Sequence, residues 1–208
     1  MLDPRFLVLK EALVSYASRA HDPPTDRHTG TQAAVSVIVR GRAELDLLLI
    51  KRAHHETDPW SGQMALPGGR WERGDDSLLD TAMRETAEET GVDLATDVHL
   101  GRLPNVHPNS PRLPHVTIQP FVFGVSSETR ARAASEEVEA VHWVSLRHLR
   151  DPATAGEVEI EVEGSPTTFP GLRVDGEVVW GLTYRILRSF LDLYPHAASQ
   201  KQGPTGTS

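Results

Sequence analysis

The stretch PGGRWERGDDSLLDTAMRETAEETGV, from Pro67 to Val92, is the most distinctive part of this chain. Its second half places Glu85, Glu88 and Glu89 close together, with one arginine beside them and no lysine. Like charges that are three or four positions apart on a helix repel one another. The stretch therefore raises the question of which positive partner balances these carboxylates.

Helix signals surround the three glutamates. Asp76 or Ser77 is suited to cap the start of a helix, and Gly91 stands where a left-handed residue commonly ends one. A helix over Ser77–Thr90 turns by about 100° per residue and places the glutamates in one narrow sector. The opposite side can then pack on a sheet while the carboxylates face a cleft. That side comprises Leu79, Met83, Thr86, Ala87 and Thr90.

The spacing of the glutamates favours a metal site over a solvated helix surface. Clustered carboxylates raise one another's pKa unless a cation binds among them. Hard oxygen ligands suit Mg²⁺ or Mn²⁺, which keep several waters and bridge to substrate phosphates. The preceding Gly68 and Gly69 let a ligand approach the backbone, and Arg84 can fix Glu88 by a charged hydrogen bond four positions along the helix.

The length and composition predict a soluble, globular protein of one domain. The chain has 208 residues, of which 38% are hydrophobic and 24% charged, and no apolar run reaches the roughly 18 residues of a membrane-spanning helix. The N-terminus lacks the features of a signal peptide, so a cytoplasmic location is the simplest expectation. The absence of cysteine excludes disulfides, thiolate metal sites and cysteine nucleophiles. A net charge of -8 argues against general nucleic-acid binding, but it permits a small phosphate-containing substrate.

Three segments divide the chain: an N-terminal helix and linker over residues 1–30, a domain over 31–195 and a disordered tail over 196–208. Strands are predicted at Ala33–Val39, Leu45–Lys51, Val98–Pro104, Val116–Val125 and Val138–Leu146, with an exposed, alternating strand at Glu157–Gly164. A long amphipathic helix is predicted over Val178–Tyr194. Strands with helices before, between and after them predict a layered α/β domain.

The motif Arg-Glu-x-x-Glu-Glu-x-Gly resembles the characteristic box of the Nudix hydrolase family. The matching residues are Arg84, Glu85, Glu88, Glu89, Gly91 and Val92. The chain departs from the box at Thr86, where an apolar residue is usual, at Asp76, which occupies the upstream Glu position, and at Gly69, which is one residue out of register. The resemblance implies a Nudix-type α/β/α sandwich with a mixed sheet between helices. It also implies hydrolysis of a nucleoside diphosphate linked to another moiety, and it suggests a homodimer without membrane partners.

The shifted first half of the box is most similar to the coenzyme A diphosphatase (CoA pyrophosphatase) branch. Pro67-Gly68-Gly69 is followed at matching offsets by Glu72, Asp75 and Thr81-Ala82-Met83-Arg84-Glu85. The upstream segments Leu48–Ala53 and Gly62–Gly69 also resemble that branch, although Thr57 replaces its second arginine and Leu66 a phenylalanine. This similarity implies that coenzyme A, or a derivative, is cleaved to 4'-phosphopantetheine and adenosine 3',5'-bisphosphate. The alternatives are a Nudix activity on ADP-ribose, dinucleotides or nucleoside triphosphates, and a catalytically silent nucleotide-binding domain.

The resemblance also assigns roles to individual residues. Glu85 and Glu89 are expected metal ligands, with Glu88 as a third ligand or as a base acting through water. Glu88, Glu89 and Arg84 form the expected catalytic group, around Mg²⁺ or Mn²⁺ that lowers the pKa of the attacking water. Arg52, Gly68 and Gly69 are expected to bind the substrate. Glu137 is either a fourth ligand or general base, or a residue that merely caps a strand at the surface.

Aromatic and histidine side chains give weaker signals. Trp60 and Trp143 are candidates to stack on an adenine, although packing in the core is the expected role of Trp143. His107 and His115 lie in a proline-rich loop where histidines are commonly incidental. The pair His54-His55 has no ligand-like spacing, and the sequence assigns it no role.

Overall fold

The computed structural model describes residues 3–17, 31–56, 60–95, 99–108, 115–162 and 164–199. The predicted linker at residues 21–30 and Thr57 lie outside these ranges. The helices are α1 (Arg5–Ala17), α2 (Leu78–Thr90), α3 (Leu146–Arg150) and α4 (Gly181–Ser199), with a 3-10 turn at Pro152–Thr154. The strands are β1 (Thr31–Gly41), β2 (Leu45–Arg52), β3 (Met64–Ala65), β4 (Gly68–Arg70), β5 (His99–Arg102), β6 (Val116–Val125), β7 (Val138–Ser145), β8 (Ala155–Val162), β9 (Ser165–Val174) and β10 (Glu177–Trp180).

A mixed seven-stranded sheet forms the centre of the molecule. Its strand order is β3-β2-β1-β6-β5, with β4 also paired to β1 and β7 also paired to β2. β1 and β6 run parallel, whereas the other pairings within this sheet are antiparallel. The central β1 is buried along most of its length, as a strand covered on both faces must be.

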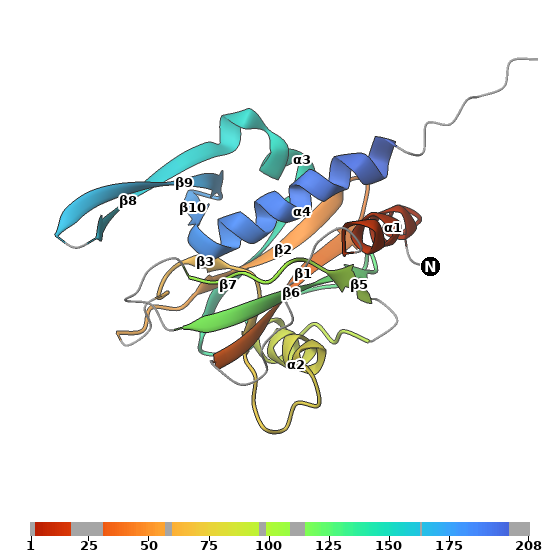
Figure 1. Cartoon of the computed structure of the whole chain (residues 1–208), viewed down its shortest axis with the longest axis horizontal. Coiled ribbons are helices and arrows are strands. Elements are labelled where there is room, and N and C mark those ends of the chain that lie inside the picture. Colours follow the sequence, from red (N-terminus) through yellow and green to blue (C-terminus); the bar gives the residue numbers. More distant parts are fainter. Residues whose placement is uncertain are drawn as a thin grey trace, which may run out of the picture.

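Helices cover both faces of this sheet, which confirms the predicted α/β/α sandwich. Figure 1 shows α1 and α4 on one face and α2 on the other. Leu9 of α1 and Phe190 of α4 belong to the larger apolar core, whereas Ala82 of α2 joins Ile38 and Phe123 in a second core. Within the described residues, no helix combines the length and the apolarity that crossing a bilayer requires.

A second sheet of order β10-β9-β8 lies beside the first one. The predicted alternating strand is its edge strand β8, but β9 and β10 were not predicted. β9 contains Pro166 and Pro170, which normally argue against a central strand. The structure accommodates them because β10 pairs only with Gly171–Val174, so both prolines lie where β9 has β8 as its single neighbour.

The helix boundaries refine the sequence prediction. Ser77 caps α2 by accepting a hydrogen bond from the Asp80 N–H, and Gly91 ends α2 with φ 67°, as the capping signals indicated. Residues 178–180, predicted to begin the last helix, belong instead to β10, and α4 continues to Ser199. The helix therefore includes residues 196–199 of the predicted tail, and the rest of that tail lies outside the described residues. The proposed division of the chain into segments stays a prediction.

The hydroxyl of Thr86 explains why a polar residue occupies an apolar position of the motif. Thr86 is fully buried, and its Oγ1 donates a hydrogen bond of 2.8 Å to Ser36 Oγ on β1. Ser36 Oγ in turn donates to the backbone oxygen of Ala82 at 3.2 Å. The hydroxyl pair therefore fastens α2 to the central strand.

We expect Thr86→Val to lower the free energy of unfolding by about 1 kcal/mol, because the buried Ser36 hydroxyl loses a partner. Urea unfolding of Ser36→Ala, Thr86→Val and the double variant checks this coupling. The double variant should be more stable than the sum of the single effects predicts, by roughly 1 kcal/mol. Strict additivity of the two effects would show that the hydroxyls are not coupled.

Candidate active site

A cavity of about 470 Å³ lies between α2, β4 and the start of α4. Of the sequence-predicted residues, Arg52, Gly68, Gly69, Arg84, Glu85, Glu88 and Glu137 line it. Glu89 lies directly behind this wall, where its Oε2 accepts a hydrogen bond of 2.8 Å from the Gly68 N–H. The fold therefore brings residues from four separate parts of the chain to one place.

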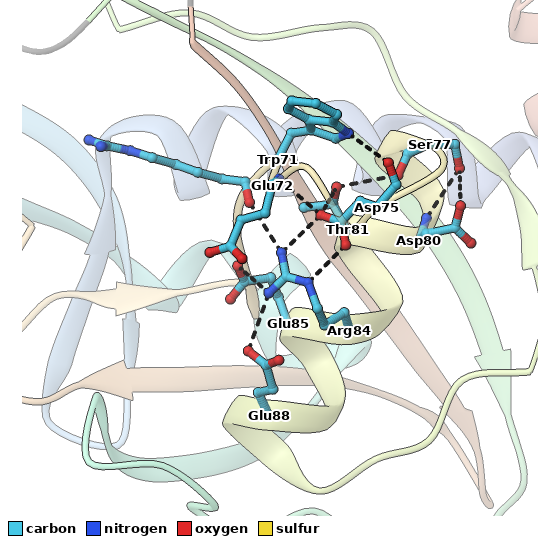
Figure 2. A network of polar contacts seen from close by, with 10 residues as sticks. Trp71, Glu72, Asp75, Ser77, Asp80, Thr81, Arg84, Glu85 and Glu88 are labelled. Atoms are coloured by element: carbon cyan, nitrogen blue, oxygen red, sulfur yellow. Dashed lines mark hydrogen bonds and ion pairs between the residues drawn. The ribbon is translucent and has the colours of Figure 1, made fainter.

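Arg84 is the centre of the polar network in this wall. Its guanidinium binds Asp75 in a bidentate manner, with Nε–Oδ1 and Nη2–Oδ2 distances of 2.9 Å (Figure 2). Its Nη1 also reaches Glu85 Oε1 at 3.0 Å and Glu88 Oε2 at 3.3 Å, the latter being the predicted contact four positions along the helix. Asp75 further accepts a hydrogen bond of 2.8 Å from Thr81 Oγ1. The Arg84 hydrogen bonds hold the pKa of the Asp75 carboxyl well below its usual range.

Asp75 is thus the acidic partner of Arg84, whereas counting along the family box pointed to Asp76. Asp75 is nearly buried and Asp76 is exposed. The displacement matches the register of Gly69, which is also one residue away from the box position. The matching offset of Asp75 in the similar branch was the signal in the sequence that pointed to this residue.

The three glutamates of α2 differ strongly in their surroundings. Glu88 is exposed and Glu85 is partly buried, whereas Glu89 is only 3% exposed. Burial is the main reason that the pKa of Glu89 rises to about 8, with the charges of Glu85 and Glu137 adding to the effect. The Gly68 N–H and Arg52, whose Nη1 is 4.0 Å from Glu89 Oε1, act in the opposite direction. The prediction that the carboxylates face a cleft therefore holds for Glu85 and Glu88, which line the cavity, whereas Glu89 is buried behind it.

The two glycines of β4 allow the backbone to approach the carboxylates. A Cβ atom on Gly69 would lie 2.3 Å from Glu85 Oε1. Gly68 has φ 148°, and a Cβ there would lie 2.2 Å from the backbone oxygen of Ala34. A side chain at Gly69 would thus displace the Glu85 carboxylate, whereas one at Gly68 would displace the backbone of the central strand β1.

The donor set in this wall fits a hard divalent cation. Among the described residues, no group of three or more histidine or acidic side chains is already arranged around a metal position. Arg84 instead forms ion pairs with Glu85 and Glu88, and the Gly68 N–H donates a hydrogen bond to Glu89. Burial raises the pKa of both Glu85 and Glu89, and mutual repulsion with Glu137 adds to it. A cluster of oxygen donors that repel one another is the environment that a cation stabilises.

The remaining predicted side chains have other positions. Trp60 lines the cavity, but Trp143 packs beneath the Arg40 guanidinium, whose Cζ is 3.9 Å from the ring centroid, so it has the expected core role. His107 and His115 are both exposed and contribute nothing to the cavity lining.

The wall of the cavity opposite the carboxylates is largely apolar, and the sequence assigned no role to it. That wall contains Val116, Ile118, Trp180, Leu182 and Ile186.

Comparison with known proteins identifies relatives of this chain. A family model described as the NUDIX domain matches residues 30–161. The Nudix hydrolase NudL of Yersinia pestis is 31% identical over 160 residues, covering 77% of this chain and 78% of that protein. The protein C14C4.10c of Schizosaccharomyces pombe is 36% identical over 119 residues, covering 55% of this chain but only 36% of that protein. A MutT/nudix family protein from Enterococcus faecalis superposes with a TM-score of 0.55 at 20% identity, covering 91% of this chain and 69% of that one.

Gly69→Ala should weaken divalent-cation binding at this wall, since the new methyl group takes the position of the Glu85 carboxylate and forces it to move. Isothermal titration with Mn²⁺, together with thermal unfolding, checks this expectation. Gly74→Ala is the matched control, because a Cβ at Gly74 meets nothing within 4 Å. Wild-type Mn²⁺ affinity in a folded Gly69→Ala variant would refute the assigned geometry.

The metal-free protein should lose stability as the pH rises from about 4.5 to about 8. The pKa of Glu89 is higher in the folded protein than in the unfolded chain, so the folded state binds the proton more tightly. The proton's stabilising effect is complete below pH 4.5 and disappears above pH 8. Glu89→Gln removes this dependence and should be more stable than wild type at pH 8.5 by on the order of 3 kcal/mol. Unfolding in EDTA across this pH range measures the difference, and parallel curves for the two proteins would contradict it.

Proposed function

Because the chain belongs to the NUDIX domain family and is a Nudix hydrolase, we propose that it cleaves the diphosphate of coenzyme A or a derivative. The products are 4'-phosphopantetheine, or its acyl form, and adenosine 3',5'-bisphosphate. The proposal includes Mg²⁺ or Mn²⁺ as cofactor, the cytoplasm as location and the homodimer that the family suggests.

The shape and polarity of the cavity carry this proposal. One wall presents Arg52, Arg70 and the carboxylates, which suits a diphosphate with its cation. The opposite wall presents Trp180, Leu182 and Ile186, which suits a long uncharged arm such as pantetheine. The base of a nucleoside triphosphate can stack on an aromatic side chain such as Trp60, but this substrate has no long uncharged arm to follow Leu182 and Ile186. The segments Leu48–Ala53 and Pro67–Glu85 support the same substrate through their likeness to the coenzyme A branch.

The residues of the wall have distinct tasks in this reaction. Glu85 and Glu89, with Glu88 and Glu137, would hold the cation, which when bound neutralises the diphosphate and lowers the pKa of an attacking water. Arg84 positions Glu85 and Glu88, and is itself fixed by Asp75. Arg52 projects from the end of β2 toward the reacting diphosphate and stabilises its charge. Either Glu88 or Glu137 accepts the proton of the water, because both carboxylates line the cavity.

We expect coenzyme A to be hydrolysed in the presence of Mg²⁺ or Mn²⁺ with a higher kcat/KM than ADP-ribose, dinucleotides or nucleoside triphosphates. Chromatography of the products in a substrate panel measures this preference. Glu89→Gln should lower kcat at least about 100-fold, as expected for loss of a metal ligand. Glu157→Gln on the second sheet is the control, since its exposed carboxylate lies outside the cavity. A large preference for ADP-ribose would refute the substrate, and full activity of Glu89→Gln would refute the metal site.

A further inference from the structure

A second cavity of about 350 Å³ adjoins the first one. Arg52 and Glu137 line both cavities, so the two meet at these side chains. The other residues that line it are Ala53, His54, His55 and Glu136. Among the described residues that line this cavity, Ala53 is the only aliphatic one, so the cavity offers polar groups where the first offers an apolar wall.

Ser61 holds the segment that carries His54 and His55. Ser61 Oγ accepts a hydrogen bond of 2.7 Å from the His55 backbone N–H. The same oxygen lies 3.1 Å from His54 Nδ1, so a hydrogen bond joins the two side chains, and its direction depends on the tautomer of the ring. When Ser61 Oγ donates to Nδ1, the neutral ring carries its proton on Nε2. In that tautomer, as in the protonated ring, Nε2 presents an N–H donor to an acceptor in the cavity.

We propose that this second cavity binds the 3'-phosphate on the adenosine half of the substrate, with His54 as a hydrogen-bond donor to its oxygens. The inference rests on the proposed function, because it assumes a substrate that carries such a phosphate. The scissile diphosphate lies at the shared residues Arg52 and Glu137, so the two halves of the substrate diverge from there. The uncharged arm follows the apolar wall of the first cavity, and the phosphorylated adenosine enters the second.

The two acidic residues of the second cavity differ in their expected effect on a bound phosphate. Glu137 faces the cation site, where a bound cation offsets its charge. Glu136 has an exposed carboxylate in the same lining and repels a dianionic phosphate. The two sides of the cavity thus have opposite effects on one ligand group. Removing the imidazole should weaken recognition of the phosphate, and removing the Glu136 charge should strengthen it.

The test compares coenzyme A with 3'-dephospho-coenzyme A, which differs only in the proposed ligand group. In His54→Leu, the ratio of kcat/KM for coenzyme A to that for the dephospho compound should fall about tenfold, the effect of one hydrogen bond to a charged group. His54→Gln, which can keep a donor near the Nε2 position, should restore part of the ratio, and Glu136→Gln should raise it. His115→Leu is the matched control, since this exposed histidine lines neither cavity. A ratio that is unchanged in His54→Leu overturns the inference.

A binding measurement separates this inference from the proposed function. Titration of the Mg²⁺-loaded protein with adenosine 3',5'-bisphosphate and with adenosine 5'-monophosphate requires no turnover. Wild type should bind the bisphosphate more tightly, and His54→Leu should lose that difference. If coenzyme A is hydrolysed but His54→Leu keeps the difference, the proposed function stands and the inference fails. If coenzyme A is not hydrolysed and the bisphosphate binds more tightly only when His54 is present, the phosphate site stands without that substrate.

Discussion

The bidentate ion pair between Arg84 and Asp75 connects the loop after β4 to helix α2, and the geometry of the carboxylate wall of the cavity depends on it. Asp75 is nearly buried, and each of its carboxylate oxygens receives a hydrogen bond from Arg84. A guanidinium held in this way has a fixed plane, so its remaining Nη1 group has a defined direction. That group reaches Glu85 and Glu88. The pair therefore orients the glutamates as well as closing the loop.

Close approach of the backbone imposes the second constraint. Glu89 is buried behind Gly68 and Glu85 contacts Gly69, so the carboxylates lie at a depth that only a strand without side chains permits. Burial of these groups costs free energy, because a desolvated carboxylate favours its neutral form. The hydroxyl pair of Ser36 and Thr86 and the caps of α2 offset part of this cost elsewhere. The wall thus retains repulsion between its glutamates that a bound cation would relieve.

The sequence predicted the features that follow from local periodicity and spacing. The bounds of α2, its caps, the long strands and the grouping of Glu85 with Glu88 come from short segments with strong patterns. The resemblance to the family, and no local pattern, suggested Glu137, with a cap at the surface as the alternative. The acidic partner of Arg84 was harder to assign, because Asp75 and Asp76 are adjacent and only the folded loop determines which one is buried. β9 was missed because two prolines hide a strand whose pairing changes along its length. β10 was missed because residues 178–180 fitted the apolar pattern of the last helix. The apolar wall was missed because Val116 and Ile186 become neighbours only when β6 and α4 meet in the folded chain.

With the proposed substrate, the junction at Arg52 and Glu137 would let one small domain distinguish the two halves of an asymmetric molecule. Both residues stand where β2 and β7 end their pairing, and the Ala53 N–H donates to the Glu137 backbone oxygen at 2.8 Å. Loops leave the sheet on either side of this contact, so one face of the junction can become apolar while the other becomes polar. The charged centre of the substrate then needs a single set of ligands at the rigid strand ends, and the variable loops set which groups are accepted on each side. A substitution in one cavity should therefore alter recognition of one half of the substrate without moving the reacting diphosphate.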